Sequence, residues 1–186
     1  MRIIVLGSDC SITFHLIENN LKGPSSLFEW CIVPRFSDIH IVLEELIKKN
    51  SIDIFEKDSL PGNLFLGNSS IYTSHYSKET YPEIVKRRWE RFVSYVQTEK
   101  VLFIYDDKNG YTSQTDIQYF KLLIEKLNPQ AKYNILLLSK EEGFTQIIEE
   151  KLFHCKFKKE HILGTIEGAC SFGPPYKFCS DRDDKD

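Results

Sequence analysis

The first eleven residues, MRIIVLGSDCS, decide how the rest of the chain is interpreted. Residues 3–6 are an unbroken apolar run that ends at Gly7, which is typical of a strand buried on both faces of a parallel sheet. A helix is expected to begin directly after this glycine. Cys10 is therefore expected in the first turn of that helix, facing inward, at the end of an interior strand of the sheet.

The expected helix has a cap at Ser8 or Asp9 and a stop at residues 22–24, which read KGP. One apolar stripe recurs along this helix at helical spacing, and we expect it to pack inward. The stripe consists of Cys10, Phe14, Ile17 and Leu21.

Apolar runs and amphipathic segments alternate along the remaining chain. Further helices are expected at residues 37–49, 82–97 and 117–127, and further buried strands at residues 101–105 and 133–138. Short strands or a hairpin are expected between residues 51 and 76, with turns at residues 61–62 and 67–68. Toward the C-terminus we expect a short helix at residues 141–150 and final strands at residues 151–157 and 161–166. This order predicts an α/β fold with a largely parallel sheet and helices on both faces, in three layers.

Length and composition predict one domain of ordinary globular character. The chain has 186 residues, of which 41% are hydrophobic, and a net charge of −3. We expect a single domain over residues 1–179 and a charged, frayed tail at residues 180–186. The sequence begins without a secretory leader and has no apolar stretch of membrane length, so we expect a cytoplasmic protein with no membrane partner. The small net charge predicts no nucleic-acid partner, and composition does not determine the oligomeric state.

The expected position of Cys10 distinguishes it from the other four cysteines. The five cysteines form an odd count without CxxC or CxxH spacing, so we expect free thiols and neither a metal nor a cofactor. Cys10 is expected at a helix N-terminus, where the helix dipole and unpaired N–H groups lower the pKa of a thiol. It is a good nucleophile in that position. The alternative is a core residue, because cysteine is among the most frequently buried residue types.

A cysteine nucleophile needs a base, and histidine is the usual one. His75 follows the turn-rich segment before the helix at residues 82–97, so a loop can carry it over the sheet edge. An exposed loop histidine is the alternative. Asp106 ends a strand, which is a common place for a carboxylate that orients the histidine, although aspartate there is also a good turn residue.

Arg88 and Arg91 lie near the apolar stripe of the helix at residues 82–97 and could reach a site. Glu83 and Glu90 interleave with the basic residues of this helix. Salt bridges along the exposed face of this helix are therefore favoured over a phosphate-binding site.

Four blocks of sequence carry a resemblance to a known family. They are residues 6–11 (LGSDCS), residues 27–30 (LFEW), His75, and residues 88–92 (RWERF) ahead of the strand at residues 101–104. Together they resemble a family of uncharacterised domains of bacteria and some large DNA viruses that is identified with papain-like cysteine peptidases. The family block reads Pro-Phe-Asp-Trp where this chain has LFEW, and an aspartate often follows the histidine where this chain has Tyr76.

The resemblance implies a papain-like cysteine peptidase with Cys10 as nucleophile and His75 as base, and a papain-like α+β fold is the alternative architecture. Asp106 as third member is our expectation from its place at a strand end. The substrate is expected to be a peptide, amide or ester bound by a further set of residues. These are Ser8, Asp9, Glu29, Trp30, Arg88 and Arg91.

Two functions from other classes stay open beside a cysteine-dependent hydrolase or acyl transferase. One is a non-catalytic module that binds an anionic small molecule at the N-terminus of the Cys10 helix, with Arg88 and Arg91. The other is an interaction protein that uses Phe28, Trp30 and neighbouring aromatic side chains as its surface. A reactive thiol at Cys10 separates the first function from both alternatives.

Overall fold

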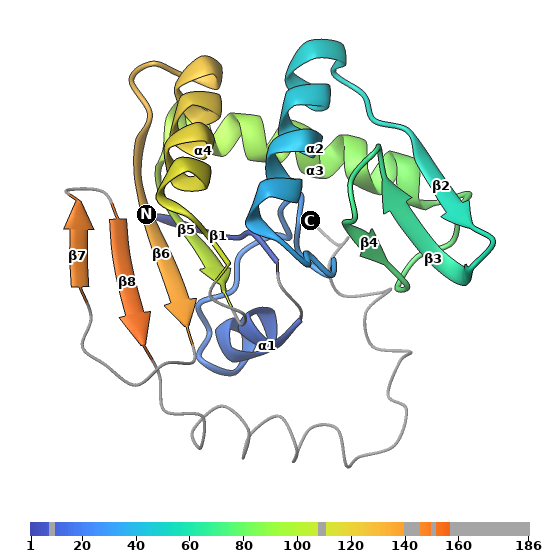
Figure 1. Ribbon diagram of the computed structural model, residues 1–186, viewed down its shortest axis with the longest axis horizontal. Helices are drawn as coiled ribbons and strands as arrows, with labels where there is room; N and C mark the ends of the chain where they lie inside the picture. The colour runs from blue at the N-terminus through green and yellow to red at the C-terminus, as the bar shows by residue number, and fades with distance from the viewer. Residues whose placement is uncertain (8–9, 108–110, 140–145, 150–151, 157–186) are drawn as a thin grey trace.

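Five strands form the main sheet, in the order β1-β5-β6-β8-β7 (Figure 1). The structure is a computed structural model, and it describes residues 1–7, 10–107, 111–139, 146–149 and 152–156. The strands are β1 (Arg2–Val5), β5 (Lys100–Asp106), β6 (Lys132–Ser139), β8 (Leu152–Lys156) and β7 (Gln146–Glu149). Neighbours from β1 to β8 pair in parallel, and β7 pairs antiparallel with β8. The predicted parallel pairing of the central strands is confirmed.

Three short strands form a separate antiparallel sheet. They are β2 (Ile54–Lys57), β3 (Leu60–Leu66) and β4 (Tyr72–Thr73), which confirms the short strands predicted for this region. The turn predicted at residues 67–68 is present, but Pro61 and Gly62 lie inside β3. The reason is an irregular register after Glu56, whose carboxylate accepts a hydrogen bond from the Gly62 N–H.

Helices cover the two faces of the main sheet unequally. The helices are α1 (Ser11–Glu18), α2 (Phe36–Lys49), α3 (Tyr81–Thr98) and α4 (Gln114–Leu127). Alternate residues of β5 point to opposite faces, so Phe103 joins the large core with α2, α3 and α4 while Ile104 joins a small cluster with Ile12 and Leu16 of α1. The chain is therefore a mixed α/β protein, and the complete three-layer arrangement stays a prediction.

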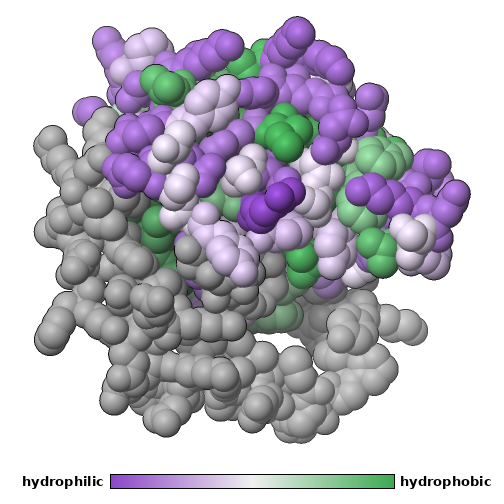
Figure 2. Space-filling view, viewed as in Figure 1, coloured by the Kyte–Doolittle hydropathy of each residue, from purple (hydrophilic) through white to green (hydrophobic). Residues whose placement is uncertain are grey.

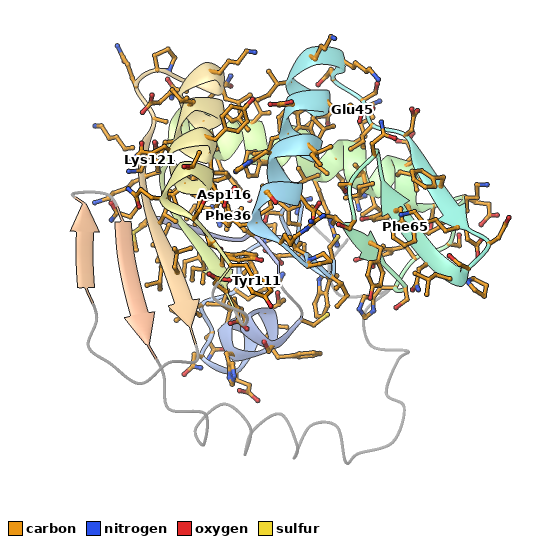
Figure 3. All side chains as sticks on the ribbon, viewed as in Figure 1. Phe36, Glu45, Phe65, Tyr111, Asp116 and Lys121 are labelled. Carbon is orange, nitrogen blue, oxygen red and sulfur yellow. The ribbon has the colours of Figure 1, made fainter. Side chains whose placement is uncertain are left out.

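The large core is rich in aromatic contacts between the helices and the sheet. Phe36 lies at the start of α2 (Figure 3). Its ring packs edge-on against Phe120 of α4 and Tyr105 of β5, with centroids 5.4 and 5.0 Å apart. Hydrophilic side chains gather over α2 and α4 on the outer face (Figure 2). Of the described helices, none is long and apolar enough to cross a membrane.

The inward stripe predicted for α1 is wrong. Phe14, Ile17 and Leu21 are 49%, 45% and 58% exposed, whereas Ile12, Thr13 and Leu16 are buried. Apolar residues recur at helical spacing on both faces of this short helix, so periodicity cannot choose between them. Packing of Ile12 and Leu16 with Val5 and Ile104 decides the orientation.

Four further expectations need correction or fall outside the described residues. β1 lies at one end of the sheet and not in its interior, although Ile4 and Val5 are fully buried. Residues 146–149 form strand β7 instead of part of a helix, because they pair with β8. The strand predicted at residues 161–166 and the tail at residues 180–186 lie outside the described residues.

Candidate active site

The central feature of the site is a contact between Cys10 and His75. The Cys10 Sγ lies 3.4 Å from the His75 Nε2, although 65 residues separate them in sequence. Both side chains are partly buried. At this distance a single proton can be shared between thiol and imidazole. The structure thus brings together the two residues that the sequence singles out as nucleophile and base.

Close backbone packing places Cys10 at the start of α1. Gly7 has a φ of +94°, and a Cβ at this position would lie 2.2 Å from the Val33 Cγ2, so no larger residue fits without displacement. Cys10 is the N-cap of α1, and its carbonyl accepts the Phe14 N–H at 3.0 Å. The predicted position of Cys10 at the helix N-terminus is confirmed, but Cys10 takes the N-cap position that the sequence predicts for Ser8 or Asp9. Ser8 and Asp9 lie outside the described residues.

His75 is held by the segment that follows β4. Its backbone N–H donates to the Thr73 Oγ1 at 3.2 Å, and the Thr73 hydroxyl donates to the Trp30 carbonyl at 2.8 Å. Burial lowers the pKa of His75, and the Arg88 guanidinium lowers it further. The imidazole is therefore neutral at pH 7, which is the form that can accept a thiol proton.

Trp30 forms a wall of the site beside His75. Its ring meets the His75 ring edge-on, with centroids 5.7 Å apart. Trp30 has a φ of 66°, a left-handed conformation that costs about 1–3 kcal/mol for a residue with a bulky side chain. Such strain persists only where surrounding contacts fix the backbone. Here the Thr73 hydroxyl binds the Trp30 carbonyl, and the Trp30 Nε1 donates to the Ser25 Oγ at 3.4 Å.

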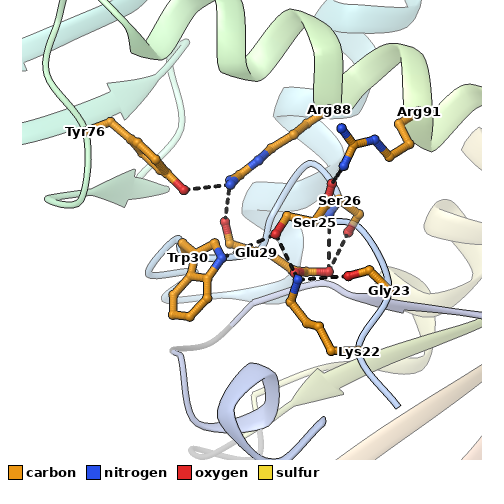
Figure 4. A network of polar contacts seen from close by, with 9 residues as sticks. All are labelled: Lys22, Gly23, Ser25, Ser26, Glu29, Trp30, Tyr76, Arg88 and Arg91. Carbon is orange, nitrogen blue, oxygen red and sulfur yellow. Dashed lines mark hydrogen bonds and ion pairs between the residues drawn. The ribbon is translucent and has the colours of Figure 1, made fainter. Parts of the chain in front are cut away.

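Glu29 lies in a buried polar network that holds the segment before Trp30 (Figure 4). Its carboxylate accepts the Ser26 N–H at 3.2 Å and forms an ion pair with the Lys22 ammonium, also at 3.2 Å. Burial raises the pKa of Glu29, while Lys22 and the Ser26 hydrogen bond act in the opposite direction. These contacts point the carboxylate at its own segment of the chain.

Arg88 and Arg91 of α3 bind the same segment. Arg88 is only 2% exposed; it donates to the Glu29 carbonyl at 3.0 Å and to the Tyr76 hydroxyl at 2.6 Å. Arg91 donates to the Ser25 carbonyl at 2.9 Å. The guanidinium groups therefore hold the chain in place, and substrate contacts by Glu29, Arg88 and Arg91 stay a prediction.

Asp106 ends β5, opposite Leu138 of β6, and is partly buried. The neighbouring Asp107 accepts the N–H groups of Tyr111 and Thr112 at 3.1 and 3.0 Å and so closes the following loop. Asp106 as a third catalytic member stays a prediction.

Sequence reasoning missed the supporting residues Thr73 and Tyr76. Thr73 acts on a carbonyl 43 residues earlier, and Tyr76 binds a guanidinium on another element. No spacing pattern marks such contacts. Cys31 has the opposite character to Cys10: it is fully buried, and burial raises the pKa of its thiol, as expected for a structural cysteine.

Comparison with protein-family models, with curated proteins and with solved structures finds no match for this chain. The site must therefore be interpreted from its own geometry. That geometry is a thiol at a helix N-terminus in contact with a neutral imidazole, beside a strained tryptophan and a buried arginine.

Proposed function

We propose that the chain is a cysteine-dependent hydrolase or acyl transferase, with Cys10 as nucleophile and His75 as general base. The observation that carries this proposal is the 3.4 Å contact between the Cys10 Sγ and the His75 Nε2. The resemblance to papain-like cysteine peptidases points to the same chemistry. A cytoplasmic location belongs to the proposal as well, because free thiols such as Cys10 and Cys31 persist in reducing compartments.

In the proposed reaction, the thiol proton moves to the His75 Nε2 as the Cys10 sulfur attacks the carbonyl carbon of a peptide, amide or ester. The carbonyl π electrons move to oxygen and form an oxyanion. When the oxyanion collapses, the bond to the leaving group breaks, and the leaving group takes the proton from the imidazolium. Water or a second nucleophile then attacks the thioester, with His75 again acting as base, and the thiol is regenerated.

The N-terminus of α1 is suited to the oxyanion. The first N–H groups of a helix have no intrahelical acceptor, and the helix dipole favours negative charge at this end. Because Cys10 is the N-cap of α1, a carbonyl attacked by its sulfur develops its charge beside these groups. In known oxyanion holes, removal of a single donor costs about 3–4 kcal/mol of transition-state stabilisation.

The function is tested with p-nitrophenyl acetate as a small activated ester. We expect release of p-nitrophenol together with an acetyl group on Cys10, detected by mass spectrometry of the digested protein, and slower loss of that group by hydrolysis. Cys10→Ala should abolish both signals, whereas Cys31 should stay unmodified because it is buried. Absence of an acetyl group on Cys10, or equal p-nitrophenol release by Cys10→Ala and the wild type, would contradict the proposal and favour a binding module.

The pH dependence of Cys10 reactivity provides a second expectation. Below its pKa the His75 imidazole is protonated and cannot accept the thiol proton, and that pKa lies below 6.5 because of burial and Arg88. The rate of Cys10 alkylation by iodoacetamide should therefore fall by less than twofold between pH 7 and 6.5 and more steeply at lower pH. A cysteine in an unstructured peptide, with a thiol pKa of about 8.5, should instead lose about tenfold in rate per pH unit over this range. A Cys10 profile with the slope of the peptide would argue against the neutral pair.

The anion-binding alternative has less support from the geometry. It requires Arg88 and Arg91 to face a ligand, but Arg88 is buried and both residues donate to carbonyl oxygens of the segment at residues 25–29. The interaction-protein alternative requires exposed Phe28 and Trp30, and both are buried.

A further inference from the structure

The His75 ring is flanked by aromatic residues from two different segments. The Trp30 ring centroid lies 5.7 Å from that of His75, and the Tyr76 ring centroid lies 6.4 Å from it. The Trp30 segment precedes α2, whereas Tyr76 belongs to the segment between β4 and α3. The position of the imidazole relative to Cys10 therefore depends on how these two segments are held together.

One guanidinium connects both segments. The Arg88 Nη1 donates to the Glu29 carbonyl at 3.0 Å, directly before Trp30, and the Nη2 donates to the Tyr76 hydroxyl at 2.6 Å (Figure 4). A guanidinium is planar, so the directions of its two donors are fixed relative to each other. Because Arg88 lies in the long helix α3 and is 2% exposed, its own position is well determined by packing.

We propose that Arg88 is a positioning residue of the Cys10–His75 pair, since its guanidinium fixes the two segments that flank the imidazole and thereby sets the ring against the sulfur. This inference rests on the proposed function. It replaces the substrate contact expected for Arg88 with a contact to the protein's own backbone.

The charge of Arg88 has a separate effect on the same ring. After burial, the guanidinium is the second cause that lowers the pKa of His75. Within the part of the chain that the structure describes, the other titratable groups in contact with the ring are the Cys10 thiol of α1 and the Tyr76 phenol, while Lys22 and Glu29 pair with each other in the segment that carries Trp30. Arg88 thus favours the neutral base, and its geometric and electrostatic effects can be separated by substitution.

Three variants separate the two effects, with Cys10 alkylation by iodoacetamide as the readout. Tyr76→Phe keeps the ring, which stacks on Tyr81 at 5.2 Å, and removes one acceptor. Arg88→Lys keeps the positive charge but loses the planar guanidinium, whose two donors bind the two segments. Both should lower the plateau rate by about tenfold, because small displacements of a reacting group are costly, and should leave the pH midpoint near that of the wild type. Arg88→Met should lower the rate and also move the midpoint to higher pH.

Arg87→Met is the matched control, since Arg87 is the preceding residue of α3 and is exposed. It should change neither rate nor midpoint. A merely structural role for Arg88 would lower the amount of folded protein without moving the midpoint, so circular dichroism is measured alongside. If Arg88→Met does not fold, the other two variants decide the inference.

Wild-type rates in Tyr76→Phe and Arg88→Lys, or an unchanged midpoint in folded Arg88→Met, would overturn the inference while leaving the nucleophile–base pair intact. If the proposed function itself is wrong, the result differs, because wild-type Cys10 is then alkylated at the rate of a cysteine in an unstructured peptide.

Discussion

Lys22→Met is expected to lower the free energy of unfolding by about 3 kcal/mol, because it leaves a buried carboxylate without its cation. The Lys22 ammonium pairs with Glu29, whose side chain is 3% exposed, and also donates to the Gly23 carbonyl and the Ser25 hydroxyl. Methionine keeps most of the apolar stem and removes the charge. Urea denaturation monitored by tryptophan fluorescence measures the loss.

Lys49→Met is the control for this prediction. Lys49 forms a similar 3.1 Å ion pair with Glu45, but its side chain is 55% exposed, and exposed pairs of this kind contribute about 0–1 kcal/mol. The double variant Lys22→Met with Glu29→Gln should recover part of the loss, since a neutral amide replaces the buried charge. Equal effects of Lys22→Met and Lys49→Met would show that the buried pair does not stabilise this segment.

The loss in Lys22→Met should depend on pH in a defined direction. Burial raises the pKa of Glu29 in the folded protein above its ordinary value of 4.5, and removal of Lys22 raises it further. The folded state then binds a proton that the unfolded state has released. The destabilisation is therefore complete above the folded-state pKa and decreases as pH falls toward 4.5.

The long periodic elements could be predicted from the sequence because their local signals agree with their tertiary contacts. The helix predicted at residues 37–49 is α2, and Asn50 ends it in a left-handed conformation with φ 54°. The helix predicted at residues 82–97 is α3, with Pro82 in its first turn. The strands predicted at residues 101–105 and 133–138 form the centre of the sheet.

The orientation and type of the short elements could not be predicted from the sequence, because contacts with residues far along the chain determine them. In α1, Ile12 and Leu16 on one face and Phe14 and Ile17 on the other are apolar. Only contact with Val5 and Ile104 determines which face is buried. Residues 146–149 form strand β7 because they pair antiparallel with β8. Pro61 and Gly62 resemble a turn, but β3 accommodates them at an irregularity in its pairing with β2.

Part of the candidate site could be predicted from the sequence. The apolar run before Gly7 identifies Cys10 as the residue at a helix N-terminus, and the resemblance singles out His75. The sequence also marks Arg88 and Glu29, but not that the guanidinium binds a backbone carbonyl or that the carboxylate pairs with Lys22. Backbone acceptors have no signature in the amino-acid sequence, so residues that hold the chain and residues that bind a ligand look alike.

His75→Gln is expected to lower the rate of Cys10 alkylation at pH 6.5 by about 100-fold. His75→Gln removes the general base, and general-base assistance typically contributes about 10²–10⁴-fold. Glutamine keeps a polar planar group of similar reach but cannot accept and carry the proton. Circular dichroism checks that the variant folds.

His15→Gln is the control for removal of a histidine from the same region. His15 lies on α1 only five positions after Cys10, is partly exposed, and its Nδ1 lies 3.3 Å from the Glu18 carboxylate. It should leave the rate of Cys10 alkylation unchanged.

The most direct test of the nucleophile–base pair is therefore the second-order rate constant for reaction of iodoacetamide with Cys10 at pH 6.5, measured by mass spectrometry on the Cys10 peptide. We expect a wild-type rate about 100 times that of His75→Gln, with His15→Gln equal to the wild type. Equal rates in wild type and His75→Gln would contradict it, because the 3.4 Å contact between sulfur and imidazole would then have no chemical consequence.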